Sequence, residues 1–212
     1  MFAKDADGAY QETRHVAAVL TGPAVDFFAA KGLVEALAAA LRVPGVTFAA
    51  EQRSQMHPGR CASITLAGKT IGYVAELDPD AAKSELDIPA AGRIAVFELN
   101  ADALLASASH IPHYTPLPRF PAVSRDLAVV VDLATPYALL ENTARAAADA
   151  ALTEQISLVS VYTGERVPNG KKSVALRLTF RSPTRTLTDA EVDTQVAAVG
   201  QQLAEQAGAE QR

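Results

Sequence analysis

The stretch Lys172–Arg181, KSVALRLTFR, alternates apolar and polar side chains from Ser173 onward. Successive side chains of a β-strand point to opposite faces of the sheet, so this alternation predicts a strand with one buried face. The predicted buried face carries Val174, Leu176, Leu178 and Phe180. The predicted outer face carries Ser173, Ala175, Arg177, Thr179 and Arg181. A sheet containing this strand needs helices over its apolar face.

The sequence on either side supplies those helices and the remaining strands. Further strands are predicted at Arg125–Asp132, Ser157–Thr163 and 209–212. One helix is predicted from Thr135 to about Leu152, because a capping residue followed by proline is a favoured helix start. A second helix is predicted from Thr188 to about Gln206, because Thr188 and Glu191 have the spacing of a capping box. The resulting order, β-α-β-β-α-β, predicts a ferredoxin-like domain.

The first half of the chain is predicted to be a module of mixed α and β structure. Strands are predicted at Arg14–Thr21, Ala62–Leu66, Thr70–Leu77 and Ile94–Leu99. The main helix is predicted over Asp26–Arg42, where apolar residues recur every three or four positions and Asp26 caps the start. Short helices are expected at 78–86 and 100–107. The segment His57–Arg60, HPGR, is expected to form a tight turn.

A proline-rich stretch separates the two parts. Four prolines, Pro112, Pro116, Pro118 and Pro121, fall within residues 107–121. Each proline fixes φ and removes a backbone donor, and the residue before it is pushed toward an extended conformation. The sequence therefore predicts a module over residues 1–106, a stiff linker over 107–120 and a second domain over 121–212.

Composition and charge exclude several classes of protein. Of the 212 residues, 49% are hydrophobic and 20% are charged, close to the average for a globular protein. The sequence has no apolar run long enough to cross a membrane, and its start does not have the pattern of a signal peptide. The one cysteine, Cys61, cannot form an intrachain disulfide, which favours a reducing compartment and a cytoplasmic location. The net charge of −5 argues against a protein that simply coats nucleic acid or membranes.

Basic residues nevertheless concentrate in the second domain, where residues 162–187 contain six basic residues and one acidic residue. Alternation in the strand Ser157–Thr163 puts Val159 and Val161 on the buried face and Leu158 on the outer face. The other residues expected on the outer face include Ser160, Tyr162, Ser173, Arg177 and Arg181. Single-stranded RNA stacks its bases on such rings and guanidinium groups. An ordinary solvated sheet face has the same sequence pattern, so both interpretations stay open.

Several motifs resemble a known family. FPAVSRD at 120–126, VYTG at 161–164, GKKS at 170–173 and RTLTDAE at 185–191 resemble the ferredoxin-fold anticodon-binding domain that ends the bacterial phenylalanyl-tRNA synthetase β subunit. VDFFAAKG at 25–32, HPGRCA at 57–62, GYVAELDP at 72–79 and VFEL at 96–99 resemble the catalytic-like module of the same subunit. The resemblance implies an α+β fold, in which part of a class II synthetase-like antiparallel sheet module precedes a ferredoxin-like domain. It also implies that the chain is the C-terminal piece of a longer subunit.

The resemblance carries expectations about function. Enzymes of the family are (αβ)₂ heterotetramers that join phenylalanine to its tRNA using ATP and Mg²⁺, with the aminoacylation site in the α subunit. A chain of this kind is implied to have no catalytic residues and no cofactor of its own, to assemble with the α subunit, and to bind the anticodon stem-loop of tRNA(Phe).

The resemblance also suggests roles for individual residues. The family's counterpart of Tyr162 stacks on the first anticodon base, a guanine, and the counterparts of Ser173 and Arg212 lie close by. Arg177 and Arg181 are expected phosphate contacts. Ser160 departs from the family, in which an acid commonly accepts from the guanine edge, and a neutral hydroxyl makes a weaker contact than a carboxylate.

The residues themselves point to no other chemistry. His57 and Cys61 are four positions apart, but the Pro-Gly pair between them argues against a helix that would bring both onto a metal ion, so no metal site is predicted. No nucleophile motif or phosphate-binding glycine loop is present. Two alternatives need no RNA, namely a regulatory module that binds a small effector and an interaction protein whose sheet face packs on a partner.

Overall fold

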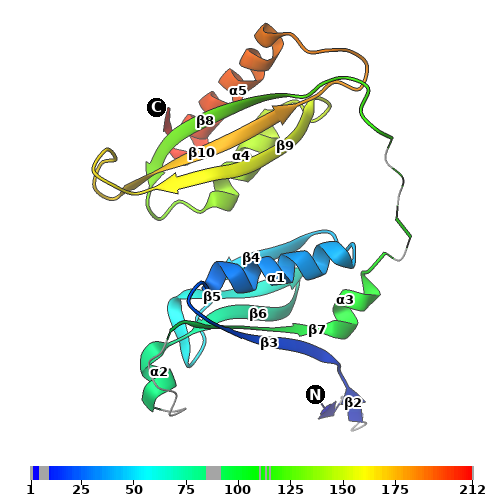
Figure 1. The fold of residues 1–212 in the computed structure, drawn as a ribbon, viewed down its shortest axis with the longest axis vertical. Coiled ribbons are helices and arrows are strands. Elements are labelled where there is room, and N and C mark those ends of the chain that lie inside the picture. Colours follow the sequence, from blue (N-terminus) through cyan, green and yellow to red (C-terminus); the bar gives the residue numbers. More distant parts are fainter. Residues whose placement is uncertain are drawn as a thin grey trace. The chain divides into compact units, whose positions relative to one another are not determined.

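The structure, a computed structural model, describes residues 2–4, 10–84, 92–109, 111–112, 114 and 116–211. The chain divides between Tyr114 and Thr115 into two units (Figure 1). Each unit has its own antiparallel sheet and its own helices, so the predicted α+β class is confirmed. The division lies inside the proline-rich stretch, while the predicted linker bounds at 107 and 120 stay a prediction. No helix in the described ranges is long and apolar enough to cross a membrane.

The second unit has the predicted ferredoxin-like order. Its strands are β8 (Val123–Asp132), β9 (Thr153–Tyr162), β10 (Lys171–Phe180) and β11 (Glu210–Gln211), and its helices are α4 (Tyr137–Ala147) and α5 (Asp189–Ala207). The sheet order is β11-β8-β10-β9, and every neighbouring pair is antiparallel. Helices α4 and α5 both lie on one side of this sheet (Figure 1).

Helix α4 is shorter than predicted at both ends. It begins at Tyr137, with Pro136 in an extended conformation just before it. It ends at Ala147 because the chain turns at Asp149, whose side chain accepts a hydrogen bond from the backbone N–H of Ala151 and whose carbonyl accepts one from Leu152. Aspartate stabilises such turns by bonding to its own neighbouring backbone, and this preference ends the helix despite the apolar pattern.

The apolar face of β10 forms the centre of the second core, as predicted. Val174, Leu176, Leu178 and Phe180 are each at most 1% exposed. They belong to a cluster that also contains Leu127, Val129 and Val131 of β8, Leu140 of α4, and Val192, Val199 and Leu203 of α5. Burial of this apolar surface is the main favourable contribution to folding of the unit. It also fixes which face of the sheet the helices cover.

Strand β9 departs from the predicted alternation. Ser160 pairs with Ala175 of β10. The register then shifts, so that Leu158 pairs with Leu176 and Val159 is the extra residue of a β-bulge. The expectation that Leu158 lies on the outer face is therefore wrong, because paired residues share a face and Leu176 is on the helix side. Val159, expected to be buried, is 46% exposed.

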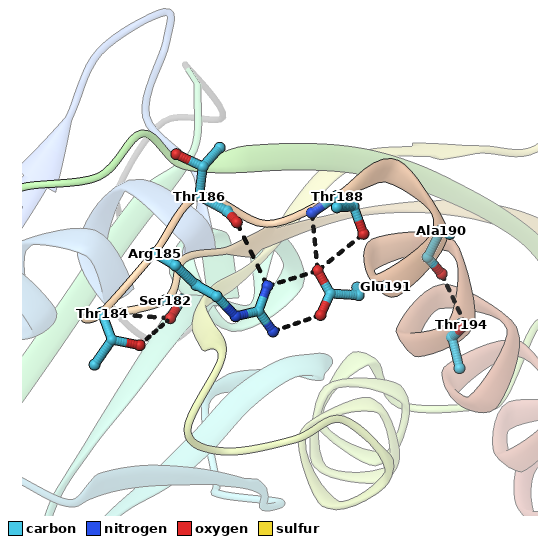
Figure 2. A network of polar contacts seen from close by, with 8 residues as sticks. All are labelled: Ser182, Thr184, Arg185, Thr186, Thr188, Ala190, Glu191 and Thr194. Carbon is cyan, nitrogen blue, oxygen red and sulfur yellow. Dashed lines mark hydrogen bonds and ion pairs between the residues drawn. The ribbon is translucent and has the colours of Figure 1, made fainter.

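The first turn of α5 is held by a network around Glu191 (Figure 2). The Arg185 guanidinium donates to both carboxylate oxygens of Glu191. Glu191 Oε2 also accepts hydrogen bonds from the N–H and the hydroxyl of Thr188, each at 2.9 Å, so the predicted capping box is confirmed. Arg185 first, and then Thr188, favour the charged carboxylate and lower the pKa of Glu191 from 4.5 to about 2.

Glu191→Gln is expected to lower the stability of the second unit at neutral pH. Because the folded pKa lies below the unfolded value, the charged carboxylate stabilises the fold above pH 4.5, and this stabilisation is lost as the pH falls toward 2. Urea unfolding, followed by NMR signals of the second unit, should give a higher midpoint for the parent chain at neutral pH. The two midpoints should converge as the pH is lowered toward 2. A midpoint difference that did not change with pH would contradict the assignment.

The first unit is built on a sheet with the order β3-β7-β6-β5-β4, antiparallel throughout. Its strands are β3 (His15–Thr21), β4 (Val46–Ala50), β5 (Met56–Leu66), β6 (Lys69–Leu77) and β7 (Ile94–Asn100), and its helices are α1 (Phe27–Ala40), α2 (Pro79–Ser84) and α3 (Ala101–Ala106). A short additional hairpin pairs β1 (Phe2–Lys4) with β2 (Tyr10–Glu12). Helix α1 packs on the central strands β6 and β7 (Figure 1).

Besides the additional hairpin, strand β4 and the segment His57–Arg60 differ from the prediction. Strand β4 was not predicted, because its five residues, VTFAA, give too short a pattern to separate from a loop. The tight turn expected at His57–Arg60 is wrong, since these residues belong to β5. The pairing with β6 is interrupted between Met56 and Cys61, and His57 Nδ1 accepts a hydrogen bond from Gly59 N there. The end of α2 expected near Leu86 lies outside the described residues.

A buried carboxylate joins three segments of the first unit. Glu76 of β6 is 3% exposed. Its Oε1 accepts a hydrogen bond at 2.7 Å from the N–H of Phe27, the first residue of α1. Its Oε2 accepts one at 2.8 Å from the Arg60 guanidinium of β5. The motifs at 25–32, 57–62 and 72–79 thus meet at one side chain.

Candidate functional site

The face of the second sheet opposite α4 and α5 is called the open face here. The strand register assigns to it Ser124, Asp126, Ala128, Val130 and Asp132 of β8, Gln155, Ser157, Ser160 and Tyr162 of β9, Lys171, Ser173, Ala175, Arg177 and Thr179 of β10, and Glu210 of β11. Most of these side chains are small, so the surface has few obstacles to a flat ligand. Its aromatic and charged side chains supply one aromatic ring, three carboxylates, one ammonium group and one guanidinium group.

Tyr162 provides that ring, at the end of β9 opposite Ser173. It is 47% exposed, as expected for a residue on an edge strand that faces away from the helices. Its phenol oxygen makes no hydrogen bond within the described part of the chain. The ring is therefore available to stack against another flat group, and only packing holds it in place.

The two candidate serines differ in accessibility. Ser160 is exposed and pairs with Ala175. Ser173 is 8% exposed, because it lies in the middle of the sheet between Val130 and Tyr162. The sequence placed both residues on the open face but gave no sign that Ser173 would be covered.

Arg177 forms a bidentate ion pair with a residue of the neighbouring strand β8. Its Nε and Nη2 donate to the two carboxylate oxygens of Asp126 on β8, both at 2.7 Å. The pair raises the pKa of Arg177 and lowers the pKa of Asp126 below its usual range. Both side chains are about half exposed, so the pair is solvated and Nη1 of Arg177 stays free of this contact.

Arg181 is bound more completely than Arg177. Its Nε and Nη2 donate to Glu154 of β9, and its Nη1 donates to the backbone carbonyl of Phe120. All three guanidinium nitrogens are thus engaged inside the second unit. Arg212, the last candidate, lies outside the described residues.

The basic stretch is largely neutralised by acids from elsewhere in the sequence. Besides Arg177 and Arg181, Lys171 pairs with Glu210 and Arg185 pairs with Glu191. Arg166 and Lys172 have no ion pair in the ranges that the structure describes. The local charge excess seen in the sequence therefore becomes a mixed surface, because folding brings an acid beside four of the six bases.

The described residues contain no group of three or more His, Cys, Asp or Glu side chains able to hold a metal ion. His57 Nδ1 accepts the hydrogen bond from Gly59, and Cys61 is buried in β5. Desolvation raises the pKa of the Cys61 thiol, and the nearby Glu51 raises it further.

Comparison with known proteins matches both units to families. Residues 118–212 match the model of the ferredoxin-fold anticodon binding domain, and residues 1–101 match that of the phenylalanyl tRNA synthetase beta chain CLM domain. The phenylalanine–tRNA ligase beta subunit of Moorella thermoacetica is 42% identical over 189 residues, which are 89% of this chain and 23% of that protein. The beta subunit of Symbiobacterium thermophilum is 44% identical over 168 residues, or 79% of this chain and 18% of that protein.

The corresponding subunit of Bacillus subtilis is 39% identical over 201 residues, which cover 89% of this chain and 24% of that protein. The chain thus spans less than a quarter of the length of these three relatives. The match runs through both units and not only through the one with the open face.

Proposed function

The chain belongs to the phenylalanyl-tRNA synthetase β-chain family, and on that premise we propose that its open face binds the anticodon stem-loop of tRNA(Phe). The observation that carries the proposal is the Tyr162 ring, which is half-exposed and whose phenol group makes no hydrogen bond among the described residues. The ring lies on a flat face of a domain that matches an anticodon-binding family. Unstacked bases of single-stranded RNA stack on such rings.

Each candidate residue has a role in this proposal. Tyr162 stacks on the first anticodon base, and the exposed hydroxyl of Ser160 meets the edge of a base. Ser173, opposite Tyr162, contacts RNA only where the ring leaves it accessible. Arg177 offers Nη1 to a phosphate. Arg181, whose nitrogens are engaged, contributes positive potential, and Arg212 is proposed as a further RNA contact.

We extend the proposal to the whole ligase. The first unit assembles with an α subunit in a cytoplasmic (αβ)₂ heterotetramer, and the α subunit joins phenylalanine to tRNA(Phe) with ATP and Mg²⁺. The chain itself is not catalytic. ATP and Mg²⁺ are proposed to act in the α subunit, with no cofactor on this chain.

Tyr162→Ala is expected to weaken binding of the anticodon stem-loop by about 1–3 kcal/mol, the typical contribution of one base–aromatic stack. Binding of the full chain would be measured with the GAA stem-loop and with the same RNA changed at its first anticodon base. The base change should cost a similar amount, and affinity should fall steeply with salt. If neither Tyr162→Ala nor the base change altered the affinity, the stacking proposal would be overturned. Binding to the α subunit without any binding to RNA would favour an interaction role.

Asp126→Asn is expected to raise the affinity for RNA by about 3-fold. It should also make the slope of log affinity against log salt concentration steeper by about 0.7, the effect of one more phosphate contact. The substitution removes a carboxylate from the open face and releases Arg177 from its ion pair. The matched control is Glu205→Gln, which removes the same charge from α5 on the other side of the sheet. Weaker binding by the Asp126 variant, at unchanged stability, would contradict the proposed contact at Arg177.

A further inference from the structure

Gly164 lies directly against the Tyr162 ring. A β-carbon at Gly164 would lie 2.3 Å from the phenol oxygen of Tyr162 and 2.5 Å from its Cζ. Real β-carbon contacts are never this short, so only glycine is compatible with the observed position of the ring. The phenol end of Tyr162 therefore rests against the main chain two residues further on.

The main chain at Gly164 is fixed more firmly than the ring. The carbonyl of Gly164 accepts a hydrogen bond at 2.9 Å from the N–H of Val167, whose side chain is buried. The φ angle of Gly164 is not positive, so an alanine could adopt the same backbone without strain. An added methyl group would thus displace the far end of the Tyr162 side chain and leave the turn in place.

Within the described part of the chain, the ring is held by packing and not by a hydrogen bond of its phenol group. Its phenol oxygen makes no hydrogen bond among the described residues, and the side chain is 47% exposed. The backbone of Tyr162 is fixed by pairing with Ser173, which leaves the side-chain torsions to be set by packing. The contact with Gly164 is a close packing contact at the phenol end of the ring.

We propose that Gly164 is a positioning residue for RNA recognition, whose missing side chain lets the Tyr162 ring lie where a base can stack on it. The inference rests on the proposed function of the open face. Gly164→Ala would push the ring away from this position and so weaken stacking, while contacts that depend on charge remain. The anticodon preference should fall and the salt dependence should not change.

A double-mutant cycle tests the inference, using the full chain and the GAA anticodon stem-loop. Tyr162→Ala is expected to weaken binding by about 5- to 150-fold and Gly164→Ala by about 5-fold or more. In the Tyr162→Ala background, Gly164→Ala should change the affinity by less than about 2-fold, because the ring it displaces is gone. Urea unfolding of each variant would check that the second unit keeps its stability.

The outcomes separate the two proposals. If Tyr162→Ala weakens binding and Gly164→Ala does not, the positioning role is overturned and the proposed function stands. The role is also overturned if Gly164→Ala weakens binding equally with and without the ring, because the glycine would then act through the fold. If Tyr162→Ala has no effect on binding, the stacking function itself fails.

Discussion

Gly72→Ala is expected to destabilise the first unit by about 3 kcal/mol or more, the upper end of the cost of forcing extra atoms into a packed core. Gly72 lies in β6, where it pairs with Ile64 of β5 and Leu99 of β7. A β-carbon there would lie 2.0 Å from the backbone carbonyl oxygen of Glu98. That oxygen belongs to the adjacent strand β7, so it cannot move aside as a flexible side chain could. The sheet would have to separate at its centre.

Cys61 provides a measurement specific to this unit. It is the one cysteine of the sequence and is 5% exposed, and burial raises the pKa of its thiol, so it should react slowly with a thiol reagent while the unit is folded. Labelling in increasing urea should reach its midpoint at a much lower urea concentration for Gly72→Ala than for the parent chain.

Gly32→Ala is the matched control, because the same substitution is made where nothing lies within 4 Å of the new methyl group. Gly32 is inside helix α1, where alanine should stabilise the unit by about 0.5–1 kcal/mol. The two variants should therefore shift the labelling midpoint in opposite directions. Equal midpoints for Gly72→Ala and the parent chain would show that β7 moves away at little cost.

The second unit was predictable because its sequence signals are local. The alternation of β10 identified the buried face through Val174 and Phe180, and the spacing of Thr188 and Glu191 identified the start of α5. Where two local signals competed, the prediction failed. Asp149 ends α4 although the apolar pattern continues. The bulge at Val159 shifts the alternation of the part of β9 before it, and nothing in the pattern marks the bulge.

The candidate site was only partly predictable, since its electrostatics depend on contacts between distant residues. Alternation placed Tyr162 on the open face without knowledge of the rest of the chain. Arg177 and Asp126, however, are 51 residues apart, and only the register of β8 against β10 makes them neighbours. Gly164 was missed for a different reason. A glycine after a strand predicts a turn, and nothing in the sequence says that a ring rests against it.

Glu76→Ala is expected to lower the free energy of unfolding of the first unit by about 3 kcal/mol, the lower end of the range for breaking a buried ion pair. The lower end applies because the partner, Arg60, is 40% exposed, so its charge can be solvated once Glu76 is gone. The loss has two sources. The N–H of Phe27 at the start of α1 loses the carboxylate that accepts its hydrogen bond, and a cavity forms beside it. The side-chain bridge from Glu76 to the start of α1 and to Arg60 of β5 is then lost.

Glu76→Gln separates both sources from the loss of charge. Its amide fills the same space and its oxygen still accepts the hydrogen bond from Phe27, while the charge facing Arg60 is lost. It should cost about 1 kcal/mol, close to the net value of one hydrogen bond, and clearly less than the alanine variant. Unfolding in urea would be followed by circular dichroism and by Cys61 labelling together. If the two midpoints agree, the loss of stability belongs to unfolding of the first unit as a whole. If Cys61 is labelled at a lower urea concentration than the circular dichroism changes, the loss belongs to local opening beside Arg60. Equal costs for the two variants would show that the charge of Glu76, and not its hydrogen bond to α1, joins the three segments.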